Sequence, residues 1–195
     1  MKKIAISILF LCVVVIVNAQ TFKPFKVDIS TGYAIPSGKG AKGGVLFVVE
    51  PKYAVIPNLS VGLRMEAAVM ARGSSLNNND EVEVDVKASA SYLATADYYF
   101  TENTVRPFAG AGVGIFSLAS ASSDANNVGV SAAKSKFGGV LRAGAEFGHF
   151  RLGLEYNLVG NTDLKDANNA TIGTSKNSYI GIKIGAVIGG GRISK

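Results

Sequence analysis

The regular alternation of apolar and polar residues is the main pattern along this chain of 195 residues. Alternation with a period of two residues predicts β-strands that have one apolar and one polar face, and no segment shows the 3.6-residue period of an amphipathic helix. We therefore predict an all-β fold built from eight strands. The eight alternating segments are residues 25–35, 44–56, 59–72, 84–100, 105–118, 137–148, 150–159 and 178–188.

Two kinds of connection alternate between these segments. Tight turns follow the second, fourth and sixth segments, at residues 57–58, 101–104 and 148–149. The other connections are longer and rich in Gly, Ser, Asn, Asp and Lys. Every second connection of a meander lies at the same end, so one rim has short turns and the other has long loops, as in outer-membrane barrels. The long connections are residues 36–43, 73–83, 119–136 and 160–177.

Charged residues are confined to one face of every predicted strand. Lys or Arg facing lipid at the bilayer midplane costs about 2–4 kcal/mol, so this segregation is expected where the uncharged face meets lipid. Beyond residue 17 no apolar run is long enough for a membrane helix, and a membrane-embedded chain without such a run must be a closed barrel. We predict an eight-stranded antiparallel up-and-down transmembrane β-barrel with its charges inside.

Alternation alone does not decide which face is inside, because a soluble lipocalin-like barrel would bury the apolar face around a ligand. Two further features favour lipid on the apolar face. Glycines accumulate on the charged face, where a narrow lumen has little room for side chains. Aromatic residues of the apolar face lie beside the tight turns, as a girdle at a membrane interface does. The aromatics that we assign to this interface are Tyr53, Tyr98, Phe100, Phe147 and Phe150.

Charged residues of neighbouring strands are expected to meet in the lumen. Two Arg–Glu pairs with a spacing of four residues lie on segments joined by the turn at His149, and inward-facing charges on adjacent strands stabilise each other. An eight-stranded barrel is only just wide enough for its own side chains. We therefore expect a salt-bridged plug rather than an open channel. The predicted lumen network comprises Glu50, Lys52, Arg64, Glu66, Arg142, Glu146, Arg151 and Glu155.

Residues 1–19 have the order of a secretory signal peptide: two lysines, an apolar run over residues 4–17 and a small residue at the expected cleavage site, Ala19. Residues 20–195 then form a single outer-membrane barrel domain. The only cysteine, Cys12, lies in the apolar run, so the mature chain is expected to lack disulfides and thiolate metal sites. The formal charge of +6, or +4 without the two N-terminal lysines, is spread without a cluster, which gives no support for nucleic-acid binding.

Catalytic, cofactor and metal sites are not expected. His149 is the only histidine and lies in a tight turn, so a two-histidine metal site is excluded and a catalytic constellation has no support. The glycine-rich stretch 110–114 lies within a strand, whereas a dinucleotide-binding loop joins a strand to a helix. The acidic residues near 80–83 and 163–166 do not match the ligand spacing of an EF-hand.

Several short motifs resemble the small OmpA/OmpX-type outer-membrane β-barrel domain family, in the style of members from the Bacteroidetes group. They are EPKY at residues 50–53, PNLSVGLR at 57–64, RPFAGAGVG at 106–114 and GAEF at 144–147. The resemblance covers the mature chain and implies contact with outer-membrane lipid and with the barrel insertion machinery. One departure concerns the end of the chain, since family members often end on an aromatic residue and this chain ends with Gly-Gly-Gly-Arg-Ile-Ser-Lys.

The functional prediction is a barrel with a side-chain-filled lumen, which is not an enzyme and has a structural or surface-interaction role through its long extracellular loops. The partner of the loops is unknown. One alternative is a narrow pore for small solutes, and another is a secreted soluble carrier of an apolar ligand. An outer-membrane enzyme is the third alternative, and the polar residues supply no nucleophile with a matching base.

Overall fold

The computed structural model describes residues 23–37, 42–76, 82–124, 127–165 and 171–190. None of these residues belongs to a helix long and apolar enough to cross a membrane. The predicted signal segment, residues 1–19, lies outside the described residues. The strands are β1 (Phe25–Pro36), β2 (Lys42–Ile56), β3 (Leu59–Leu76), β4 (Val82–Tyr99), β5 (Val105–Asp124), β6 (Asn127–Phe147), β7 (Phe150–Val159), β8 (Thr162–Lys165), β9 (Thr171–Ser175) and β10 (Tyr179–Gly189).

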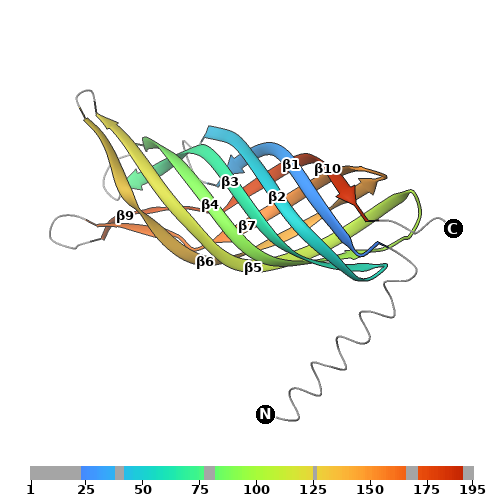
Figure 1. Ribbon diagram of the computed structural model, residues 1–195. Helices are drawn as coiled ribbons and strands as arrows, with labels where there is room; N and C mark the ends of the chain where they lie inside the picture. The colour runs from blue at the N-terminus through green and yellow to red at the C-terminus, as the bar shows by residue number, and fades with distance from the viewer. Residues whose placement is uncertain (1–22, 38–41, 77–81, 125–126, 166–170, 191–195) are drawn as a thin grey trace, which may run out of the picture.

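Eight of these strands form a closed antiparallel barrel. Strands β1 to β7 pair in sequence order, β7 pairs with β10, and the pairing of β10 with β1 closes the sheet. Figure 1 shows the strands running obliquely around the barrel, as closure of a sheet requires. The predicted eight-stranded up-and-down barrel is confirmed.

The short turns also lie where the sequence predicts them, at residues 57–58, 100–104 and 148–149. The last of these is a two-residue turn between the paired residues Phe147 and Phe150, and Gly148 has a φ of 59°, a conformation that favours glycine. We call the end of the barrel that carries these turns the short-turn rim.

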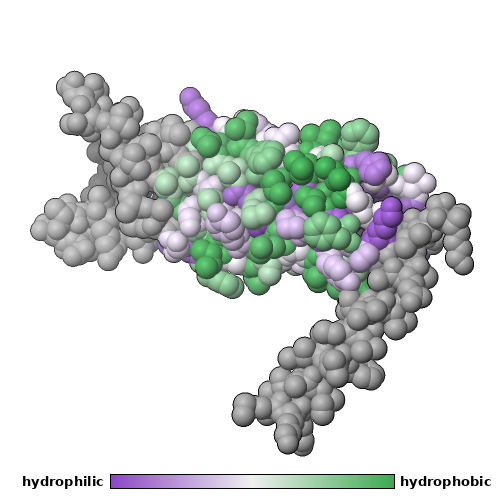
Figure 2. Space-filling view, in the orientation of Figure 1, coloured by the Kyte–Doolittle hydropathy of each residue, from purple (hydrophilic) through white to green (hydrophobic). Residues whose placement is uncertain are grey.

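Each strand sorts its residues between the inside and the outside of the barrel. On β7, Arg151 and Glu155 are buried, whereas Leu152 and Leu154 are 48% and 55% exposed. The same alternation holds on β10, where Lys183 is buried between two exposed isoleucines, Ile182 and Ile184. Figure 2 shows apolar side chains spread over the outer surface that is in view. The interior therefore contains the charged face of the strands, as the glycine and aromatic patterns predict.

All four predicted long loops contain strand residues, because β1 to β4 also reach into the predicted loops over residues 36–43 and 73–83. The other two predicted loops contain more strand. The predicted loop over residues 119–136 is a continuation of β5 and β6, which pair up to Asp124 and Asn127 with one register shift near Leu118. The predicted loop over residues 160–177 contains the hairpin of β8 and β9, and β9 adds to the end of β3. These segments are rich in small polar residues that favour loops in isolation. Pairing with a neighbouring strand overrides that weak preference.

Candidate functional site in the barrel lumen

A network of charged side chains occupies the lumen on the side of the short-turn rim. Among the described residues, twelve charged side chains are buried, with no residue more than 5% exposed. Six are cations and six are anions, so their formal charges cancel. The cations are Lys26, Lys52, Arg64, Arg142, Arg151 and Lys183, and the anions are Asp28, Glu50, Glu66, Asp97, Glu146 and Glu155. We call these twelve residues the charge network.

Arg142 lies at the centre of the charge network. From β6 its guanidinium reaches across the lumen to Glu50 on β2, with two nitrogen–oxygen distances of 2.7 and 2.8 Å. Its Nε donates to Asp97 on β4 at 2.7 Å. Such forked arginine–carboxylate bonds fix geometry as well as charge. Arg142 thus ties three strands together through the interior.

Toward the short-turn rim, Arg151 continues the charge network. It lies 3.0 Å from Asp28 and 2.8 Å from Asp97. Lys26 pairs with Glu146 at 3.0 Å. The hydroxyl of Tyr99 accepts hydrogen bonds from Lys26 and Arg151 and donates one to Glu146, at distances of 2.8, 2.9 and 3.0 Å.

Glu155 links the centre of the charge network to its far side. It lies 3.7 Å from Arg142, 2.7 Å from Arg64 and 2.5 Å from Lys183. Arg64 also pairs with Glu66. Together with the contacts of Lys52 to Asp28, Glu50 and Asp97, these bonds join all twelve charges into one continuous network.

The structure brings together all eight residues that the sequence assigns to the lumen network. It adds Lys26, Asp28, Asp97, Lys183 and the hydroxyl of Tyr99, which the sequence reasoning did not include in the network. The four added charges were detectable, because they fall on the same alternating face as the predicted ones. The inward position of Tyr99 was harder to predict, because its two neighbours, Tyr98 and Phe100, are also aromatic and belong to the outer face.

Glycines on the inner face make room for the charge network. Gly110 lies between Asp97 on β4 and Arg142 on β6 in the paired register. A Cβ atom at this position would lie 2.1 Å from Asp97 Oδ1 and 3.2 Å from Arg142 Nε. The bond between Asp97 and Arg142 therefore passes over a residue that has no side chain.

We expect Gly110→Ala to lower the free energy of unfolding by about 1–3 kcal/mol, because the added methyl group displaces Asp97. Gly153→Ala is the matched control, since a Cβ at Gly153 would meet its nearest atom at 3.9 Å. This control should raise stability by up to about 1 kcal/mol through the unfolded state. Urea unfolding in detergent measures both, and equal effects would show that Gly110 has no special place beside the network.

Apolar side chains fill the lumen beyond the charge network, away from the short-turn rim. We call the end of the barrel opposite that rim the long-loop end. The sequence analysis did not predict this apolar layer. Residues 45–49 and 67–71 are continuously apolar or nearly so, which was the available signal that both strand faces are apolar there. The apolar layer comprises Ala34, Leu46, Val48, Ala68, Met70, Leu93, Phe116, Leu118, Val140, Val159 and Tyr179, none of them more than 7% exposed.

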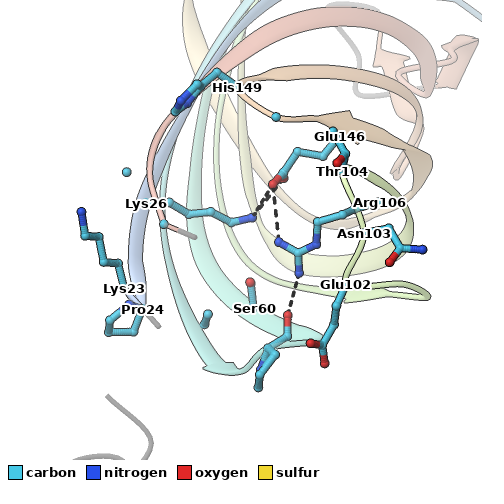
Figure 3. A pocket seen from close by; sticks show the side chains of 15 residues that line it. Lys23, Pro24, Lys26, Ser60, Glu102, Asn103, Thr104, Arg106, Glu146 and His149 are labelled. Carbon is cyan, nitrogen blue, oxygen red and sulfur yellow. Dashed lines mark hydrogen bonds and ion pairs between the residues drawn. The ribbon is translucent and has the colours of Figure 1, made fainter. Parts of the chain in front are cut away.

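A recess of about 430 Å³ opens at the short-turn rim. Figure 3 shows the side chains of Lys26 and Arg106 both pointing toward Glu146, with His149 farther away at the upper left. Arg106 donates to the carbonyl oxygen of Pro57 at 2.6 Å and lies 3.7 Å from Glu146. Its side chain therefore lies beside the charge network at the short-turn rim.

His149 is hydrogen-bonded to the backbone of β10. Its Nδ1 donates to the carbonyl oxygen of Val187 at 2.9 Å, and its own carbonyl accepts from the amide of Val187 at 2.7 Å. These bonds fasten the turn to β10. Within the described part of the chain, no group of three or more His, Cys, Asp or Glu residues is arranged to hold a metal ion.

The aromatic residues assigned to the interface lie on the outer face near the short-turn rim. Tyr98, Phe100, Phe147 and Phe150 are exposed, and Tyr53 is half-buried. Tyr98 and Phe100 contact each other edge to face, with 5.6 Å between ring centroids.

The chain matches a known protein family by sequence and known structures by fold. A family model described as "Outer membrane protein beta-barrel domain" matches residues 5–185. Neisserial surface protein A superposes with a TM-score of 0.60 at 16% identity, covering 86% of this chain and 98% of that chain. The outer membrane protein OprG from Pseudomonas aeruginosa superposes with a TM-score of 0.53 at 12% identity, covering 87% of this chain and 99% of that chain. Among curated proteins, none is similar enough to this chain to match it. At these identities the structural likeness establishes a shared fold.

Proposed function

Because the chain belongs to the family of outer membrane protein β-barrel domains, we propose that it forms a closed, non-conducting barrel in the bacterial outer membrane, with a structural or surface-interaction role. The observation that carries this proposal is the continuous charge network in the lumen. Its twelve buried charges, six of each sign, are all joined by ion pairs.

Ion passage through the charge network would require its pairs to separate. Removing one partner of a buried ion pair typically costs about 3–5 kcal/mol, because the remaining charge is left without compensation. Arg142, Glu50 and Asp97 meet at the centre of the lumen at hydrogen-bond distances. A path between them opens only when several such bonds break together.

The outer surface supports contact with lipid. Exposed apolar residues such as Phe47, Leu141, Leu154 and Ile184 lie on different strands around the barrel. Exposed apolar surface of this extent marks a membrane or interaction surface. A soluble carrier would instead turn this apolar strand face inward and expose the charged face to water. We infer that the aromatics at the short-turn rim, Tyr53, Tyr98, Phe100, Phe147 and Phe150, lie at the periplasmic membrane interface.

The long-loop end supports a surface-interaction role. Strands β3 to β6 continue beyond the ends of β7 and β10, and β5 pairs with β6 as far as Asp124 and Asn127. Such a projecting ribbon offers a paired backbone to an external partner while the barrel holds it in place. We also infer that the chain is not an enzyme, since the contacts of His149 are to a backbone carbonyl and amide.

Conductance in planar bilayers tests the closed lumen. The purified wild-type protein should give no stable openings, whereas a porin with an open lumen, reconstituted in the same way, should conduct. Stable single-channel openings of the wild-type protein would contradict the proposal and favour the narrow pore.

A truncated ribbon tests the surface role. Leu118 and Lys134 are paired across β5 and β6, so residues 119–133 can be replaced by the two-residue turn Asn-Gly. The barrel should keep its heat-dependent mobility on a denaturing gel. Cells that carry the truncated protein should adhere less to surfaces than cells that carry the full chain, and equal adhesion would count against this role.

A further inference from the structure

We propose that the apolar layer is a second barrier to ions, in series with the charge network. This inference rests on the proposed function of a closed barrel and deepens it. If the charge network were the only barrier, a rearrangement of its ion pairs would open the lumen. The apolar layer makes such a rearrangement insufficient for conduction.

The apolar layer is a complete ring. Each of the eight barrel strands contributes at least one of its residues, from Ala34 on β1 to Tyr179 on β10. On β2 the inward residues change from Lys52 and Glu50 to Val48 and Leu46 in the direction of the long-loop end. The ring therefore spans the whole cross-section of the lumen beyond the charges.

The same change in character occurs on strands that run in the opposite direction. On β3 the inward residues Arg64 and Glu66 are followed by Ala68 and Met70. On β7 the charged Arg151 and Glu155 precede the neutral Asn157 and Val159. On these three strands the inward side chains thus change from charged near the short-turn rim to neutral farther along the barrel.

Large side chains of the apolar layer pack across glycines of other strands. Phe116 is fully buried and lies over Gly138, where an added Cβ would come within 2.8 Å of its ring. Leu46 lies over Gly181, where an added Cβ would come within 3.1 Å of Leu46 Cδ2. The glycines allow these side chains to reach toward the barrel axis, which closes the ring from opposite sides.

The two layers oppose ions through different physics. A passing ion can exchange its water for charged partners within the charge network. The apolar layer offers no such exchange, and hydrophobic constrictions block ions because water leaves them. Buried polar side chains beside it, such as Ser89, Ser91 and Asn157, carry no charge. The hydroxyl of Tyr179 donates to Glu66, which joins the layer to the edge of the charge network. Loss of the central ion pairs therefore leaves the lumen closed.

Conductance of four proteins tests the inference. They are the wild type, the network variant Glu50→Gln/Arg142→Met, the layer variant Leu93→Ser/Phe116→Ser and the combination of all four changes. The network variant removes one charge of each sign from a bonded pair. Leu93 and Phe116 are fully buried members of the apolar layer on neighbouring strands. Heat-dependent gel mobility shows that each protein is folded before it is measured.

We expect stable openings in the combined variant alone. Openings in the network variant, with a silent wild type, would overturn the inference and leave the proposed function intact. Openings in the wild type would overturn the proposed function itself. A folded combined variant that stays silent would also overturn the inference, because another part of the lumen would then be the barrier. If the combined variant does not fold, the milder Phe116→Ala in the network variant applies the same test.

Discussion

Replacing Arg142 by methionine is expected to lower the free energy of unfolding by about 3–5 kcal/mol, the usual cost of leaving a buried charge without its partner. The guanidinium of Arg142 binds Glu50 at two points and Asp97 at a third, and its side chain is 1% exposed. Methionine replaces only the aliphatic part of arginine and carries no charge, so Glu50 loses its forked partner. Urea unfolding in detergent, followed by gel mobility, measures the change.

Two related variants separate charge from geometry. Arg142→Lys keeps the charge and loses the fork, so its destabilisation should be smaller than that of Arg142→Met. The double variant Glu50→Gln/Arg142→Met removes both charges and should recover part of the lost stability. An Arg142→Met protein as stable as the wild type would show that Arg142 is not bonded inside the lumen.

Placing arginine at Leu141 is expected to cost about 2–4 kcal/mol in a lipid bilayer, because the charge would face hydrocarbon near the bilayer midplane. Leu141 is 56% exposed on the outer face of β6, near the middle of the wall of the barrel. Refolding into lipid vesicles at different urea concentrations measures this cost.

Val105→Arg is the matched control for this change. Val105 is exposed on the outer face of β5 at the short-turn rim, where a charge should cost only about 0–1 kcal/mol. The difference between the two positions reports depth in the membrane rather than loss of an apolar side chain. Equal costs at Leu141 and Val105 would contradict the proposed position of the bilayer.

The eight barrel strands and their faces could be predicted because local patterns determine them. Alternation identifies each strand, and glycine-containing or proline-containing turns such as 57–58 and 148–149 separate consecutive strands. The choice of inside and outside required information beyond alternation. Glycines such as Gly110 on the charged face and aromatics such as Phe150 near the short turns supplied it.

The continuation of β5 and β6 into a ribbon and the hairpin of β8 and β9 could not be predicted, because their pairing depends on the neighbouring strand. Apart from Val128 and Val130, residues 127–136 are small or polar types with little strand preference of their own. They form β6 because β5 lies beside them and supplies hydrogen-bond partners. Strand preference in such segments is a property of the sheet rather than of the residues.

The predicted lumen network was incomplete because contacts across a barrel depend on its diameter. Arg142 and Glu50 are 92 residues apart and meet only when the sheet closes. The apolar layer was missed for a different reason. The inner face was identified by its charges, so inward apolar residues such as Phe116 and Leu93 did not enter the description of the lumen.

Membrane extraction tests most directly the central claim that charges lie inside and apolar residues face lipid. Cell envelopes are washed with alkaline carbonate, and the protein is then compared on a denaturing gel with and without heating. We predict that it stays with the outer-membrane fraction and changes its mobility on heating, as a lipid-embedded closed barrel does. Release by the wash into the soluble fraction, with the same mobility before and after heating, would contradict the claim.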